Sequence, residues 1–234
     1  MSDFENLLKE YRDQVNKSLQ EVVPSEESRL AEAMRYAVLN WGKRLRPIRV
    51  YLSSGLGTCD NQPKESAACA VELIHCYSLI HDDLPCMDND EIRRGKLSTH
   101  KKFGESTAVL AGNSLLTFAF EILSDKKLKL NNTVKIELIN ELASCSGHSG
   151  IAGGQYLDLN FENKKISQKK ITDMEIKKTG KLFAFCCVAP VLISNKNQKV
   201  LKFFEKIGYE IGLLFQITDD LIDRCKKANF DGLC

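Results

Sequence analysis

Two clusters of carboxylates are the residues of this chain best suited to chemistry. The first comprises Asp82, Asp83, Asp88 and Asp90, and it directly follows an apolar helical pattern. Carboxylates this close together repel one another and are held together most easily by cations. Such oxygen ligands suit Mg²⁺, which binds through one or two carboxylates plus phosphates. Arg93 and Arg94 lie just beyond the cluster and supply forked donors for phosphate oxygens. The pattern predicts a site for a diphosphate and Mg²⁺.

A second cluster repeats this arrangement late in the chain. Asp219, Asp220 and Asp223 close another apolar helical pattern, and Gln216 precedes them by one turn. Because Asp219 and Asp223 are four residues apart, they share one helical face. A single acidic cluster is most often a solvated helix face. Two clusters that each follow an apolar helix favour a shared metal site instead.

Helices must position both clusters, because apolar residues recur at three- and four-residue spacing through most of the chain. No stretch alternates convincingly with period two. We expect helices over about residues 3–21, 25–41, 47–55, 63–84, 106–124, 133–160, 168–194 and 198–226. Glycines between residues 147 and 154 predict a kink or tight helix packing. The predicted fold is an all-α, single-domain bundle with a central cavity lined by the two Asp-rich motifs.

Composition narrows the class of protein. With 234 residues, 43% of them hydrophobic, the chain can bury one large core. A net charge of +2 with interspersed acids and bases argues against nucleic-acid binding. The charged N-terminal region predicts no signal peptide, and the lack of a long apolar run predicts no membrane insertion. Nine cysteines, an odd number found mostly in helical patterns, indicate reduced thiols in a cytoplasmic protein.

Shorter stretches between the clusters add basic and polar side chains. The run from Gly42 to Pro47 places three cations at a predicted helix start, where backbone N–H groups also favour an anion. Taken alone, it could equally be an ordinary basic loop. His75 lies seven residues before Asp82 and projects from nearly the same helical face. A lone histidine on an apolar helix is more often a core residue. The patterns at 153–158 and 178–180 are weak by themselves and could be a helix crossing and a helix C-cap.

Taken together, these stretches resemble a known family. Asp-Asp-x4-Asp at 82–88 and Asp-Asp-x2-Asp at 219–223 resemble the two aspartate-rich motifs of the trans-prenyltransferases, or polyprenyl diphosphate synthases. The similarity extends over residues 41–223, with five stretches in the family's order. It implies the isoprenoid synthase fold, Mg²⁺ as three ions with bound diphosphate, and a homodimer. It also implies the condensation of isopentenyl diphosphate with dimethylallyl or geranyl diphosphate.

The resemblance also implies a role for each matching residue. The residues that it implies as metal ligands are Asp82, Asp83, Asp88, Asp219, Asp220 and Asp223. The residues that it implies for binding isopentenyl diphosphate are Lys43, Arg46, His75 and Arg94. The residues that it implies for binding the allylic diphosphate are Arg93, Gln155, Lys178, Thr179 and Gln216. Asp82, Asp83, Asp88, Arg93 and Lys178 are the predicted catalytic residues.

Product length is predicted from the helix that ends at Asp82. Ser78 lies one turn before this aspartate, and the large, rigid Tyr77 beside it could close a pocket. By itself Tyr77 could equally be core packing. An aromatic residue five before the motif, with Pro85-Cys86 inside it, resembles the bacterial farnesyl diphosphate synthases. We therefore expect a C15 product; a geranylgeranyl diphosphate synthase is the alternative.

The region after Asp223 departs from the family pattern. Lysine-containing stretches and further helices would follow there, whereas this chain reads Arg224 to Cys234. We expect one domain over residues 1–234, truncated at its C-terminal end after about residue 223. An inactive truncated enzyme or a non-catalytic partner subunit of the same fold is therefore a further alternative. A metal-dependent phosphohydrolase would need more histidine ligands than the sequence places near its acids.

Overall fold

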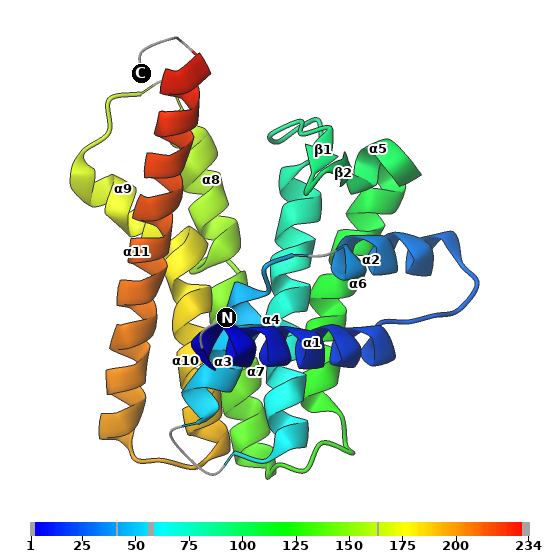
Figure 1. Cartoon of the computed structure of the whole chain (residues 1–234), viewed down its shortest axis with the longest axis vertical. Coiled ribbons are helices and arrows are strands. Elements are labelled where there is room, and N and C mark those ends of the chain that lie inside the picture. Colours follow the sequence, from blue (N-terminus) through cyan, green and yellow to red (C-terminus); the bar gives the residue numbers. More distant parts are fainter. Residues whose placement is uncertain (1–2, 41, 56–58, 163, 231–234) are drawn as a thin grey trace.

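The computed structural model describes residues 3–40, 42–55, 59–162 and 164–230 and is almost entirely helical there. The elements are α1 (Asp3–Val22), α2 (Arg29–Leu39), α3 (Leu45–Ser54), α4 (Asn61–Asp82), β1 (Ile92–Arg93), β2 (Lys96–Leu97), α5 (Thr99–Phe103), α6 (Glu105–Ser124), α7 (Asn132–Ser146), α8 (Ile151–Phe161), α9 (Gln168–Glu175), η1 (Ile176–Gly180), α10 (Lys181–Ile193) and α11 (Gln198–Phe230). The predicted all-α bundle is confirmed (Figure 1).

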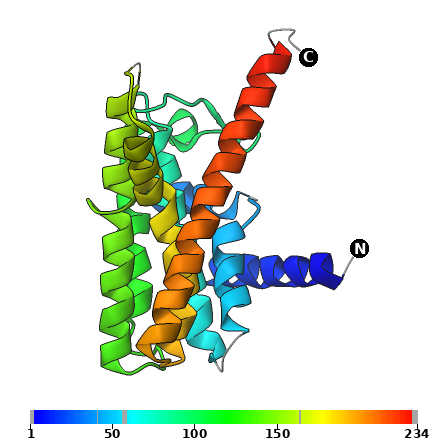
Figure 2. The same ribbon diagram turned by 90° about the vertical axis from the view of Figure 1, so that its left-hand side faces the viewer.

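The bundle is built around α4, which is buried on nearly every side. All residues from Ala67 to Ile74 are buried, as expected for a helix that is apolar all round. α6 packs along it, and α3 and α10 also contact it. α7, α10 and α11 run roughly along the same direction, whereas α1 lies across the bundle (Figures 1 and 2). Because α4 ends at Asp82, the first acidic cluster lies at one end of the bundle.

A buried ion pair holds the basic loop against α4. Arg44 Nη1 lies 2.5 Å from Glu72 Oε1, and both side chains are 1% exposed. Arg44 also donates to Asn16 Oδ1 at 3.0 Å and to the carbonyl oxygen of Val38 at 2.6 Å. A buried pair is tolerated when its remaining donors are satisfied in this way. These contacts also hold the backbone next to Lys43, the residue before Arg44.

Three local features differ from the predicted helices. The single helix expected over 133–160 is divided into α7 and α8, because at Gly150 the chain comes so close to Cys145 that a Cβ atom would overlap its backbone. The helix expected over 168–194 contains the π-helical turn η1. A short antiparallel hairpin pairs Ile92 with Leu97. Its turn holds Arg94 and Gly95 at positive φ, the geometry of a type I′ hairpin.

One helix in the described ranges, α6, is long and apolar enough to cross a membrane. Its fully buried residues, among them Ala108, Ala111 and Leu115, face the core, where α6 packs along α4. The eight cysteines within the described ranges are all free.

Candidate active site

The first acidic cluster lies at the end of α4. Asp82 is half-buried, Asp83 is buried and Asp88 is exposed. Burial is the main reason that the pKa of Asp82 rises to about 7. The positive charge of Lys178 lowers this pKa, and the negative charges of Asp88 and Asp83 raise it. Burial also raises the pKa of Asp83 and of Asp88. Carboxylates that are this reluctant to ionise without a cation suit a site that binds one.

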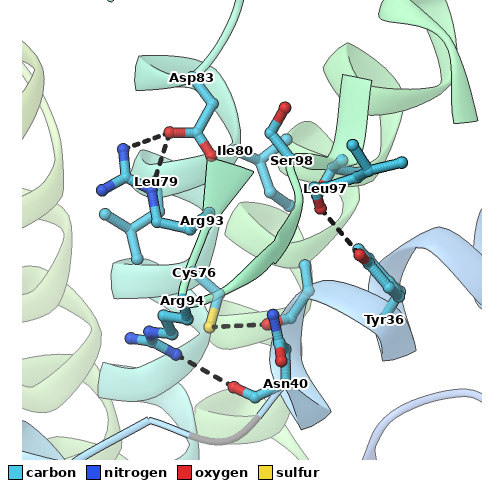
Figure 3. Close-up of a pocket in the computed structure, with 12 residues that line it drawn as sticks. Tyr36, Asn40, Cys76, Leu79, Ile80, Asp83, Arg93, Arg94, Leu97 and Ser98 are labelled. Atoms are coloured by element: carbon cyan, nitrogen blue, oxygen red, sulfur yellow. Dashed lines mark hydrogen bonds and ion pairs between the residues drawn. The ribbon is translucent and has the colours of Figure 1, made fainter. Parts of the chain in front are cut away.

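Asp83 makes its main contact with Arg93 on the hairpin (Figure 3). Arg93 Nε donates to Asp83 Oδ1 at 2.9 Å, and Arg93 Nη2 lies 2.8 Å from Asp90 Oδ2. The hairpin is also tied to α2, because the Tyr36 hydroxyl donates to the carbonyl oxygen of Leu97 at 2.8 Å. Asp83 therefore orients Arg93. If Asp83 also bound a metal ion, as predicted, the metal would compete with this ion pair.

Four predicted isopentenyl diphosphate residues line one cavity of about 540 Å³: Lys43, Arg46, His75 and Arg94. Arg94 crosses from the hairpin to donate to the carbonyl oxygen of Asn40 at 3.2 Å (Figure 3). Its guanidinium occupies the space where a Cβ atom on Gly42 would lie, so a larger residue there would displace the Arg94 side chain. Arg12 of α1 lines the same cavity and was not predicted. No local sequence pattern marks it, since only the crossing of α1 brings it here.

Arg46 connects this cavity with the second acidic motif. Its guanidinium lies 4.9 Å from the ring centroid of Phe183 and 5.9 Å from that of Phe215, which precedes Gln216. Burial lowers its pKa. Arg46 Nη1 is 3.1 Å from His75 Nε2. Because arginine can only donate, Nε2 accepts, and His75 is neutral with its proton on Nδ1.

A second group of predicted residues lies on α8, η1 and α11, from which the charge of Lys178 acts on Asp82. Lys178 Nζ lies 2.5 Å from Asp158 Oδ2, and the Thr179 hydroxyl donates to Gln216 Oε1 at 3.1 Å. Gln155 is 5% exposed, and neither atom of its amide has a hydrogen-bond partner among the described residues. A buried amide without partners suits a position that a polar ligand completes. Lys178 and Thr179 lie on the π-helical turn η1, of a kind frequent at functional sites, whereas Gln155 lies on α8 and Gln216 on α11.

The second acidic motif is only partly described. Asp219 is exposed on α11, while the side chains of Asp220 and Asp223 lie outside what the structure describes. Among the described residues, no group of three His, Cys, Asp or Glu side chains could hold a metal ion by itself. Mg²⁺ is usually held by one or two carboxylates plus phosphate oxygens, and Asp82 and Asp88 supply carboxylates at the end of α4.

The two predicted product-length residues behave differently. Tyr77 is 7% exposed, and its hydroxyl donates to the carbonyl oxygen of Ser146 at 3.0 Å, so its ring reaches from α4 to the end of α7. Ser78 donates to the carbonyl oxygen of His75 at 2.9 Å, within its own helix. Only Tyr77 spans between helices.

His75 should make the protein's stability depend on pH. Burial, followed by the charges of Arg46 and Arg94, lowers its pKa well below 6.5. Below about pH 6.5, His75 becomes protonated in the unfolded chain but not in the native protein. The free energy of unfolding therefore falls by about 1.4 kcal/mol for each pH unit. His75→Gln keeps an acceptor for Arg46 but cannot be protonated. As the pH is lowered from about 7.5 to about 5, the free energy of unfolding of His75→Gln, measured with urea, should therefore rise by about 2 kcal/mol relative to that of wild type.

The matched control for this prediction is His148→Gln at an exposed histidine, which should follow the wild-type pH dependence. An identical pH dependence for His75→Gln and wild type would mean that His75 takes up its proton at the same pH in the native and unfolded states, and would contradict the prediction.

Comparison with known proteins gives a consistent result. A profile of the polyprenyl synthetase family matches residues 27–232. Farnesyl diphosphate synthase of Micrococcus luteus is 42% identical over 224 residues, which are 94% of this chain and 73% of that protein. Geranylgeranyl pyrophosphate synthase 4 of Arabidopsis thaliana is 39% identical over 97% of this chain and 61% of its own length. The crystal structure of a FPP/GFPP synthase from Zymomonas mobilis superposes with a TM-score of 0.90 at 41% identity, covering 94% of this chain and 81% of that one.

Proposed function

Since this chain belongs to the polyprenyl synthetase family, we propose that it joins isopentenyl diphosphate head to tail to an allylic diphosphate and makes farnesyl diphosphate. The predicted family and fold are confirmed, and farnesyl diphosphate synthases at about 40% identity bear out the predicted prenyl transfer. The observation that carries the assignment is the cavity lined by Arg46, His75 and Arg94 together with the acidic cluster at the end of α4, on which the charge of Lys178 acts. The buried amide of Gln155, without a partner among the described residues, supports it.

The carboxylates at the end of α4 fit the Mg²⁺ that this family generally uses. Asp82 and Asp88 would hold it from one side and Asp219 of α11 from the other, with Asp220 and Asp223 as further candidates. We propose three ions with the bound diphosphate. Bound Mg²⁺ would neutralise negative charge on the departing diphosphate.

The residues of the chain position both substrates for this reaction. Arg93, Lys178, Gln155, Thr179 and Gln216 hold the allylic diphosphate, whose C–O bond breaks to leave an allylic cation and inorganic diphosphate. The π electrons of isopentenyl diphosphate, held by residues of the Arg46 cavity, form the new C–C bond. The released diphosphate takes the proton that is then lost. Donors already aimed at the leaving charge lower the barrier, and the apolar bundle interior excludes water from the cation.

Tyr77 ends chain growth in this proposal. Adding one more isoprene unit buries about five carbons, which at about 0.8 kcal/mol each would favour elongation by about 4 kcal/mol. The side chain that closes the product pocket, here called its floor, must oppose this free-energy gain. Tyr77 is suited to do so, because it is buried and its hydroxyl is hydrogen-bonded to the end of α7. Farnesyl diphosphate is therefore favoured over geranylgeranyl diphosphate as the product.

We further propose that the chain is one domain, acts as a homodimer in the cytoplasm, and neither inserts into a membrane nor binds nucleic acid. Figure 2 shows the C-terminal part of α11 (Gln198–Phe230) projecting beyond the other helices.

The assay that tests the proposal uses geranyl and isopentenyl diphosphates. With Mg²⁺, the purified chain should release diphosphate and form a C15 product, identified by chromatography and mass spectrometry. EDTA should abolish both. Activity that persists in EDTA contradicts the metal assignment, and a folded chain without activity supports the non-catalytic alternative.

A further inference from the structure

His81 packs into a space on α6 that only glycine leaves open. A Cβ atom built on Gly112 would overlap Nε2, Cδ2 and Cε1 of the His81 ring, the last of them at 2.9 Å. Gly112 lies in the interior of α6, where glycine is less favourable than alanine. A glycine in such a place usually has a packing reason. Here that reason is the imidazole ring, which lies directly against the backbone of α6.

A hydrogen bond fixes the orientation of this ring. His81 Nε2 lies 3.2 Å from the carbonyl oxygen of Val109, also on α6. Because a carbonyl can only accept, Nε2 carries a proton and donates. The His81 side chain is therefore held on α6 by one hydrogen bond and one close contact, although its backbone belongs to α4.

The same ring contacts Tyr77, one turn earlier on α4. The ring centroids are 5.8 Å apart and the ring planes meet at 76°, an edge-to-face arrangement. At its other end, the Tyr77 hydroxyl is bonded to the carbonyl oxygen of Ser146 on α7. Tyr77 is thus restrained from two sides, by α7 directly and by α6 through His81.

We propose that His81 is a positioning residue for product length, which holds the Tyr77 ring across the path of the growing chain. The inference rests on the proposed function, in which Tyr77 ends elongation. An aromatic ring ends elongation only if it cannot rotate aside, since burial of each further isoprene unit pushes against it. His81 supplies this restraint through Gly112 and Val109, and it needs no contact with either substrate.

The test uses two variants that act on the same ring from different helices. Gly112→Ala displaces the imidazole from α6, and His81→Ala removes it. Each should raise the ratio of C20 to C15 product by about two- to tenfold, the scale of one aromatic pair. The KM values for both substrates should stay near those of wild type. In Gly112→Ala/His81→Ala the added methyl group meets empty space, so the double variant should match His81→Ala alone.

The control is Val109→Ala, which keeps the accepting carbonyl and should still make C15 product. Circular dichroism checks folding, and if Gly112→Ala does not fold, His81→Ala decides alone. If Tyr77→Ala lengthens the product but folded His81→Ala does not, the positioning role of His81 is overturned and the Tyr77 floor stands. If Tyr77→Ala also stops at C15, both are overturned. Additive effects in the double variant, or a loss of turnover without longer product, contradict the coupling through His81.

Discussion

Asp82→Asn should lower kcat by at least about 10²-fold, the scale on which a single electrostatic stabiliser contributes to catalysis. The substitution keeps the size of the side chain and removes its charge. Asp82 is half-buried at the end of α4, and burial and neighbouring carboxylates raise its pKa to about 7. A carboxylate with a pKa raised this far ionises fully only when a cation lies beside it. Its negative charge would therefore be present when the metal and diphosphate are bound, and the Asn variant would lack it.

The measurement is steady-state turnover of geranyl diphosphate at saturating Mg²⁺, with far-UV circular dichroism to confirm the helices. Asp173→Asn serves as the matched control, because Asp173 is an exposed aspartate on α9 away from the α4 cluster. It should retain near-wild-type turnover. An Asp82→Asn enzyme as active as this control would remove Asp82 from the metal site.

Local periodicity was sufficient to predict most of the helices and the position of the first acidic cluster, whereas the other site residues were predicted from the family resemblance. Asp82 follows a long run of buried apolar residues, and such a pattern determines where the helix ends and therefore where the carboxylates lie. The basic loop, too, could be placed at a helix start, because Pro47 follows its cations within the first turn of α3.

Contacts between distant segments could not be predicted in this way. Arg12 reaches the anion cavity only because α1 crosses the bundle, and Glu72 is paired only because the loop before α3 folds onto α4. The break between α7 and α8 depends on the approach of Gly150 to Cys145, which helical periodicity does not encode. The hairpin did leave one local signal, the Arg94-Gly95 pair, whose glycine favours a type I′ turn.

Replacing Tyr77 by alanine should change the product from C15 to C20 or longer and leave the Mg²⁺ dependence intact. The ring is 7% exposed and its hydroxyl is bonded to Ser146, so its removal opens the space between α4 and the end of α7. About 4 kcal/mol from burial of another isoprene unit then favours continued growth, which should raise the ratio of C20 to C15 by about 10²-fold or more.

This change is measured by the lengths of the products after prolonged incubation with excess isopentenyl diphosphate. Tyr156→Ala provides the control, because that tyrosine is 66% exposed on α8 and its loss opens no buried space. It should still yield C15 product. Removing the Tyr77 ring also costs stability, about 3–5 kcal/mol for a buried aromatic, so the comparison is made well below the melting temperature of the variant. If folded Tyr77→Ala still stops cleanly at C15, the floor is formed by other residues, because the aromatic ring would then not have been resisting elongation.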